Sequence, residues 1–90
     1  MSSLRARLEQ GPVYGKGIGK TVYKVTEPET YTEVIVQEDE FRIRRVSGDR
    51  PTSIFYDLED GSGVGTVNET TKEKFESVKQ KALQRMDYGN

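Results

Sequence analysis

The chain of 90 residues contains no cysteine and no histidine. The missing cysteine excludes disulfide bonds, a thiolate nucleophile, cysteine-rich zinc sites and cysteine-ligated iron–sulfur clusters. The missing histidine removes the commonest general base and the commonest zinc or haem ligand. Any catalysis would have to rely on Asp, Glu, Lys or Tyr, so we predict a protein that is not an enzyme and holds no metal or cofactor.

Apolar residues are also scarce. Leu, Ile, Val and Phe supply only 20 of the 90 residues, just above the level of roughly 20% below which disorder is the default expectation. Because the net charge is only −1, self-repulsion does not open the chain. We therefore expect a single domain with a thin core over residues 13–88, preceded at 1–12 by a flexible tail or a short helix.

No apolar run approaches the ~18 residues of a membrane span, and the first ten residues lack the apolar centre of a secretory signal. We accordingly expect a cytoplasmic protein without membrane contact, in the host cytoplasm if the gene is viral.

Valine and isoleucine together number 13, against six for leucine and alanine, which favours strands over most of the chain. The expected strands are residues 13–26, 31–37, 41–46 and 54–58, with 64–67 as a short edge strand. A helix is expected over residues 69–86, where apolar residues recur at helical spacing. The predicted fold class is α+β, with a small antiparallel sheet of three to four strands and one C-terminal helix packed on it.

The helix is predicted to begin at Asn68 or Thr70, since Thr70 with Glu73 fits the capping-box pattern. The expected core combines strand and helix positions that share an apolar face. Its members are Val34, Val36, Phe41, Ile43, Ile54, Tyr56, Phe75, Val78 and Ala82.

A four-residue loop at 37–40 defines the register of one strand pair. It places Val36 opposite Phe41 and Val34 opposite Ile43, so that all four share one apolar face. A loop one residue shorter would scatter the valines among arginines, because a slip of one residue exchanges the two faces of a strand.

Charge is segregated along the chain. Residues 27–40 hold six carboxylates and no cation, whereas residues 41–50 carry a net charge of +3. The simplest interpretation is that neighbouring strands of opposite sign pair across the sheet, with Glu33 opposite Arg44. The alternative is separate acidic and basic surfaces on a module that docks a charged partner.

Two segments are candidate binding sites. In the predicted register Arg42 and Arg44 project from the face that also carries Tyr31 and Ile35, and we expect this set to bind a partner. Arginine forks beside an aromatic ring suit a phosphorylated protein partner or a nucleic-acid strand. Because carboxylates surround this set and the formal pI is near 5.5, a locally neutralised sheet face is the simpler interpretation.

The second segment, residues 15–21, has the sequence GKGIGKT. Its spacing does not fit a P-loop, which needs four residues between its glycines and a helix after the motif. A weaker hypothesis remains, that the segment is a simple anion site. In it Gly17 and Gly19 leave backbone N–H groups free for an anion, while Lys16 and Lys20 add positive charge. The alternative is a flexible edge strand whose lysines discourage aggregation.

We predict a non-catalytic binding or regulatory module that docks onto another protein. The alternative is a binder of a nucleotide or nucleic acid through residues 15–21. Self-association through strand edges or the helix would complete the thin core.

Overall fold

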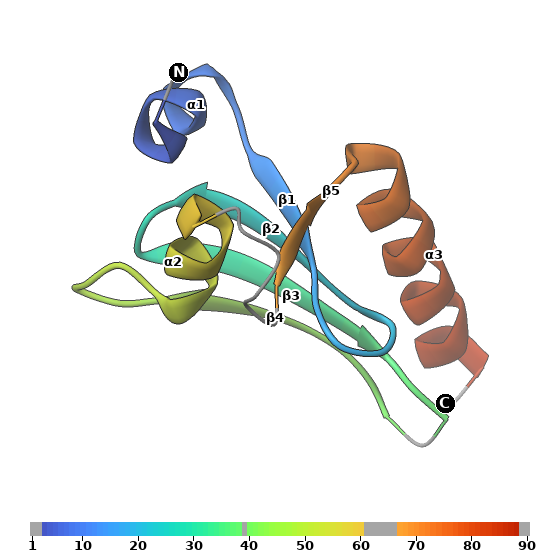
Figure 1. Cartoon of the computed structure of the whole chain (residues 1–90). Helices are drawn as coiled ribbons and strands as arrows, with labels where there is room; N and C mark the ends of the chain where they lie inside the picture. The colour runs from blue at the N-terminus through green and yellow to red at the C-terminus, as the bar shows by residue number, and fades with distance from the viewer. Residues whose placement is uncertain (1–2, 39, 61–66, 89–90) are drawn as a thin grey trace.

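Most of the β-branched residues of the chain lie in a five-stranded antiparallel sheet (Figure 1). The computed structural model describes residues 3–38, 40–60 and 67–88. The strands are β1 (Val13–Lys16), β2 (Thr21–Glu27), β3 (Thr30–Val36), β4 (Phe41–Ser47) and β5 (Asn68–Thr70). Their order in the sheet is β4-β3-β2-β1-β5. The predicted α+β class is confirmed, although the sheet has more strands than expected.

The predicted register of β3 and β4 is also confirmed. Val36 lies opposite Phe41, and Val34 lies opposite Ile43. The backbone N–H of Gln37 donates to the Glu40 carbonyl at 2.6 Å, which closes the connection between the two strands. Val34 and Val36 are buried, while the two β4 residues, on the outer strand, are half-buried.

The single strand expected over residues 13–26 is wrong, because the chain reverses in its middle and forms the hairpin of β1 and β2. Gly17 N–H donates to the Thr21 carbonyl at 2.8 Å and closes the turn. Gly19, in that turn, has φ of +71°, a left-handed conformation that residues with a side chain adopt at a cost. The lysine-rich segment is therefore the tip of a hairpin.

The strand expected over residues 54–58 is also wrong, because it is the helix α2 (Ser53–Asp60). The Phe55 N–H donates to Thr52 Oγ1 at 3.2 Å, as at a helix N-cap. Ile54, Phe55 and Leu58 are buried on one helical face, whereas Tyr56, expected in the core, is 54% exposed. The apolar spacing at 54, 55 and 58 suits a helix, although alternation at 54, 56 and 58 had indicated a strand.

Two further helices lie at the ends of the chain. The helix α1 (Leu4–Gln10) begins at Ser3, whose Oγ accepts from Ala6 N–H at 3.2 Å. The helix α3 (Lys72–Tyr88) begins after Thr71, whose Oγ1 accepts from Lys74 N–H at 3.1 Å.

The predicted caps of the C-terminal helix are wrong, because Asn68 and Thr70 belong to strand β5. The edge strand expected at residues 64–67 falls mostly outside the described residues.

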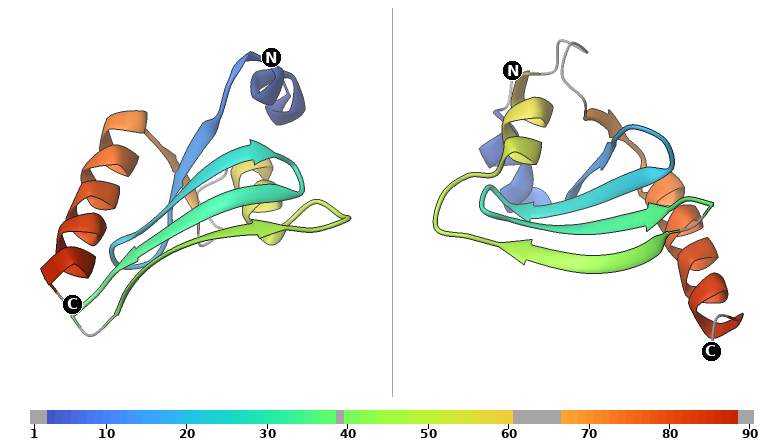
Figure 2. Two further views of the ribbon diagram at one scale, coloured as in Figure 1. Left: turned by 180° about the vertical axis from the view of Figure 1, so that it is seen from behind. Right: turned by 90° about the horizontal axis from the view of Figure 1, so that it is seen from below.

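The sheet carries an apolar layer on each face. The helix α3 covers one face (Figure 2), where the buried residues are Val22, Val34, Val36, Phe75, Val78 and Ala82. The helices α1 and α2 cover the other, where the buried residues are Leu4, Val13, Val25, Ile54, Phe55, Leu58 and Val67. The sequence had predicted a helix on only one face. Within the described part of the chain, no helix is both long and apolar enough to span a membrane.

Candidate anion-binding groove

The hairpin of β1 and β2 presents its lysines to the face of the sheet that α3 covers. Tyr14 packs on Phe75 of α3, with ring centroids 5.4 Å apart. Since side chains two residues apart on a strand share a face, Lys16 points to the same side. Lys16 lies opposite Val22, which is buried beneath α3. Lys20 follows in the turn.

A cavity of about 180 Å³ opens between this hairpin and α3. Four lysines line it, two from the hairpin (Lys16 and Lys20) and two from the helix (Lys74 and Lys81). The apolar part of its wall consists of Val22, Val36 and Val78. No carboxylate is among the described residues that line this cavity. We call it the lysine groove.

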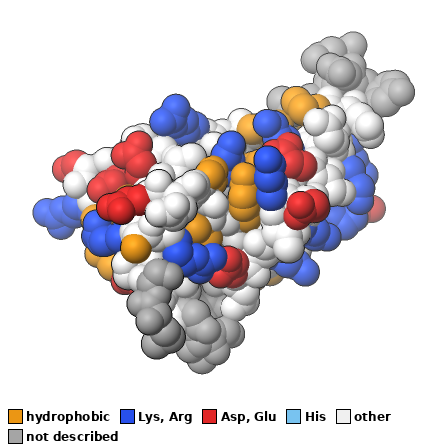
Figure 3. All heavy atoms as spheres, turned by 90° about the horizontal axis from the view of Figure 1, so that it is seen from above, with side chains coloured by type: hydrophobic (Ala, Val, Ile, Leu, Met, Phe, Trp, Pro, Cys, Tyr) orange, Lys and Arg blue, Asp and Glu red, His pale blue; other side chains and the backbone are white. Residues whose placement is uncertain are grey.

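The helix α3 supplies two lysines to the lysine groove because their spacing along the sequence places them on the same side of the helix. Lys74, Val78 and Lys81 recur at intervals of four and three residues, which places them on one helical stripe. The helix carboxylates Glu73 and Glu76 lie about 100° and 160° around the helix axis from Lys74, by the 100° turn per residue. In the space-filling view, Lys and Arg side chains are numerous toward the right-hand edge, the side on which α3 lies, with some Asp and Glu side chains between them (Figure 3).

The four lysines of the groove make no ion pair within the described part of the chain, where Arg7, Arg42 and Arg44 supply the cations of the ion pairs. Like charges around a common cavity repel one another. An anion bound between them would relieve that repulsion, as bound anions do in concave basic sites.

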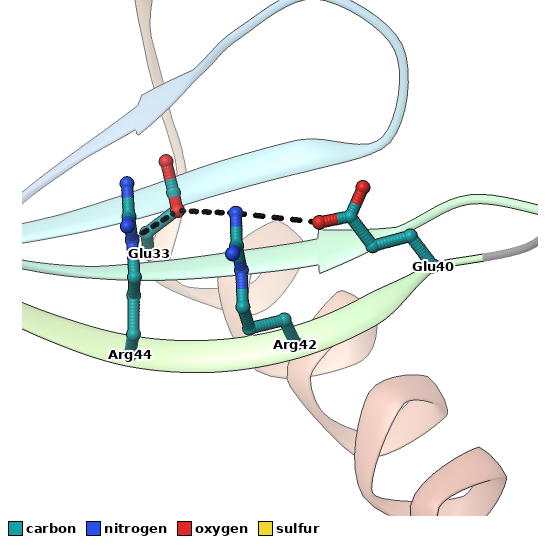
Figure 4. A network of polar contacts seen from close by, with 4 residues as sticks. All are labelled: Glu33, Glu40, Arg42 and Arg44. Atoms are coloured by element: carbon teal, nitrogen blue, oxygen red, sulfur yellow. Dashed lines mark hydrogen bonds and ion pairs between the residues drawn. The ribbon is translucent and has the colours of Figure 1, made fainter.

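The two arginines of β4 have the opposite surroundings (Figure 4). Arg44 Nε donates to Glu33 Oε1 at 2.8 Å. An Arg42 terminal nitrogen lies 3.3 Å from a Glu40 carboxylate oxygen and 4.0 Å from Glu33 Oε1. The predicted pairing of oppositely charged strands is thus present, and two carboxylates balance two guanidinium groups.

The other two residues predicted for partner binding lie on the same sheet face as these arginines. Tyr31 packs edge-on against Tyr23, with ring centroids 5.5 Å apart. Ile35 lies opposite Arg42 and is buried. The structure therefore brings all four predicted residues to one face but leaves Ile35 little surface for a partner.

The glycines differ from one another in placement. Gly19 lines the lysine groove, whereas Gly17 lines a separate hollow with Ile18 and Tyr23. The Gly17 N–H is engaged in the hairpin turn, so it is not available to an anion in the way the sequence suggested.

The helix side of the lysine groove was not predicted from the sequence. Lys74 and Lys81, with Arg85 beyond them, form a cationic stripe that borders the apolar one formed by Phe75, Val78 and Ala82. The signal was their spacing of seven and four residues without a carboxylate on the same stripe.

Function has to be inferred from these residues themselves. Comparisons with protein-family models, curated proteins and solved structures find no match to the chain.

Proposed function

We propose that the protein binds a phosphate-bearing ligand in the lysine groove and does not transform it. The observation that carries this proposal is the set of four lysines around one cavity, none of them in an ion pair within the described part of the chain. Lysine ammonium groups are compact point charges with three donors each, and they bind phosphate oxygens in many proteins.

The size and the wall of the groove fit a ligand in which the phosphate is attached to a small group with some apolar surface. A cavity of about 180 Å³ is smaller than the roughly 300 Å³ at which sites for drug-sized ligands begin. It suits a phosphate group and the part of the ligand next to it. The valine wall offers apolar contact to a sugar or a base.

Binding without turnover is supported by the donor set. The titratable groups among the described residues that line the cavity are lysines. At neutral pH an ammonium group donates hydrogen bonds but cannot act as a general base. A ligand in this groove would meet positive charge and donors.

A direct test is calorimetric titration with pyrophosphate and a panel of nucleotides. We expect saturable binding that Lys74→Gln with Lys81→Gln weakens at least about 100-fold, since each lost charged hydrogen bond costs about 1.5–3 kcal/mol. The matched control is Lys72→Gln with Lys79→Gln, which makes the same charge change at the same spacing outside the groove. Equal losses in both double variants, or no heat with any ligand, would refute the proposal.

Docking of a protein partner is the second candidate, favoured by the position of β4. This strand is at the outer edge of the sheet and carries the half-exposed Arg42 and Arg44. Outer strands can pair with another chain. Arg42→Ala with Arg44→Ala should then weaken capture of the partner and leave pyrophosphate binding intact. Sedimentation at several concentrations would show whether the partner is a second copy.

A further inference from the structure

We infer that the ligand of the lysine groove is a single strand of nucleic acid, held by its phosphate backbone over several nucleotides. This inference rests on the proposed function, and it concerns the extent of the site. Two further cavities adjoin the lysine groove, and both share Lys20 and Val36 with it. The three therefore lie side by side between the hairpin and α3, with Arg85 at one end; we call them the channel.

The channel is longer than one phosphate group. The cations that α3 contributes lie at positions 74, 81 and 85, so the rise of 1.5 Å per residue spreads them over roughly 16 Å. Cations so far apart cannot converge on one phosphate. Successive phosphates of a strand lie at least about 3.4 Å apart along its axis, so the channel would meet about three to five of them.

Two observations favour one strand over a duplex. The cations stand on both walls, with Lys16 and Lys20 on the hairpin and Lys74 and Lys81 on α3, so a strand in the channel would be contacted from two sides. The cavities are also small, about 180 Å³ for the lysine groove and about 420 and 340 Å³ for the two that adjoin it. A duplex would reach only their rims.

The lining of the channel favours contact with the backbone over reading of bases. No aromatic residue is among the described residues that line the three cavities, so bases have no ring there on which to stack, and the contacts fall to the backbone. Three valines supply apolar contact that any nucleotide can use. The protein should therefore bind strands of different sequence about equally.

One end of the channel is organised by the turn between β3 and β4. Arg85 donates through Nη1 to the Gln37 carbonyl at 3.1 Å, which fixes the guanidinium while leaving its other N–H groups for a phosphate. Glu38 also lines this end, and its negative charge would repel a polyanion that extended beyond Arg85.

The inference predicts that affinity depends on strand length. In fluorescence anisotropy with labelled thymidine oligonucleotides, binding should tighten from the dinucleotide to about the tetranucleotide to hexanucleotide, which carry roughly three to five internucleotide phosphates, and change little beyond that. Log affinity should fall with log salt at about −0.7 per phosphate contact, a total slope of about −2 to −3.5 for three to five contacts. Lys74→Gln with Lys81→Gln should reduce the slope by about 1.4, whereas Lys72→Gln with Lys79→Gln should not change it.

Arg85→Gln separates this inference from the proposed function. It should weaken an octanucleotide about tenfold while leaving pyrophosphate and a mononucleotide unaffected, because these fit beside the lysines. A thermal melt checks that the variant is folded.

Each alternative ligand gives a different result. Binding of the mononucleotide as tight as that of the octanucleotide would overturn the strand inference but retain phosphate binding. Absence of binding by every phosphate compound would overturn both. A duplex that binds more tightly than the single strand, or an oligoglutamate of equal charge that binds as tightly, would also refute the inference.

Discussion

Phe75→Ala tests whether α3 is held on the sheet by its apolar stripe, on which the position of the groove depends. The Phe75 side chain is 1% exposed and lies among the valines beneath α3. Removing a buried phenylalanine ring costs about 3–5 kcal/mol, from lost burial and the remaining cavity. At about 0.05–0.15 kcal/mol per residue, a chain of this length has roughly 4–13 kcal/mol in total. The variant should lose about a quarter of its stability or more.

Urea unfolding followed by far-ultraviolet circular dichroism measures this loss. The control is Leu83→Ala on the same helix, because Leu83 is 39% exposed and its truncation should cost under about 1 kcal/mol. The melting temperature of Phe75→Ala should fall by at least about 12 °C, taking 4–8 °C per kcal/mol for a domain of this size. Coincident unfolding curves for the two variants would show that α3 does not pack on this face.

Three further changes test other contacts. Gly15→Ala should cost about 1–3 kcal/mol in urea unfolding, because its Cβ would lie 2.7 Å from Val67 Cγ1; an unchanged midpoint would contradict this packing. Glu33→Gln should cost about 1–2 kcal/mol, since it weakens a charged hydrogen bond from the half-exposed Arg44. In a double-mutant cycle with Arg44→Ala, a coupling energy of zero would refute that interaction. Burial, with a smaller contribution from the Glu33 charge, raises the pKa of Tyr23, so the unfolded chain loses this proton first. The contribution of Tyr23 to stability should be constant below about pH 10 and fall above it. Tyr23→Phe should therefore flatten the fall in alkaline melts; an equally steep fall would contradict it.

The register of β3 and β4 was predictable because two signals agreed. Valines alternate with other residues on β3, and a slip of one position would have exchanged the apolar and charged faces. The same register sets Glu33 opposite Arg44. Apolar burial and charge pairing therefore select one alignment.

The helix α2 could not be predicted in this way. Its short apolar segment fits both a strand and a helix, and periodicity does not distinguish them over so few residues. The choice depends on Phe55, which is buried against α1 residues and the β1–β2 part of the sheet. Arg5 of α1 also lies over its ring, with the guanidinium carbon 5.3 Å from the centroid. These are tertiary contacts that local sequence does not specify.

Only the hairpin side of the lysine groove was predictable, because the other side also depends on tertiary contacts. Lys16 and Lys20 stood out because glycines surround them. Lys74 and Lys81 are ordinary surface lysines of a helix, and they meet the hairpin only because Phe75 and its neighbours seat α3 on that face. A site formed by two segments more than fifty residues apart requires their packing to be known.

The acidic pI near 5.5 argues against nucleic-acid binding only if the charges are evenly mixed, and they are not. Glu33 and Glu40 lie beside Arg42 and Arg44 on the opposite face of the sheet from α3. Because each carboxylate offsets the charge of an adjacent guanidinium group, these ion pairs produce little net electric field. The groove lysines have no such partners within the described residues. An anion approaching the groove responds to the nearby potential, because charges beyond about 8 Å are largely screened at physiological salt. A chain with a net charge of −1 can therefore present a strongly positive channel.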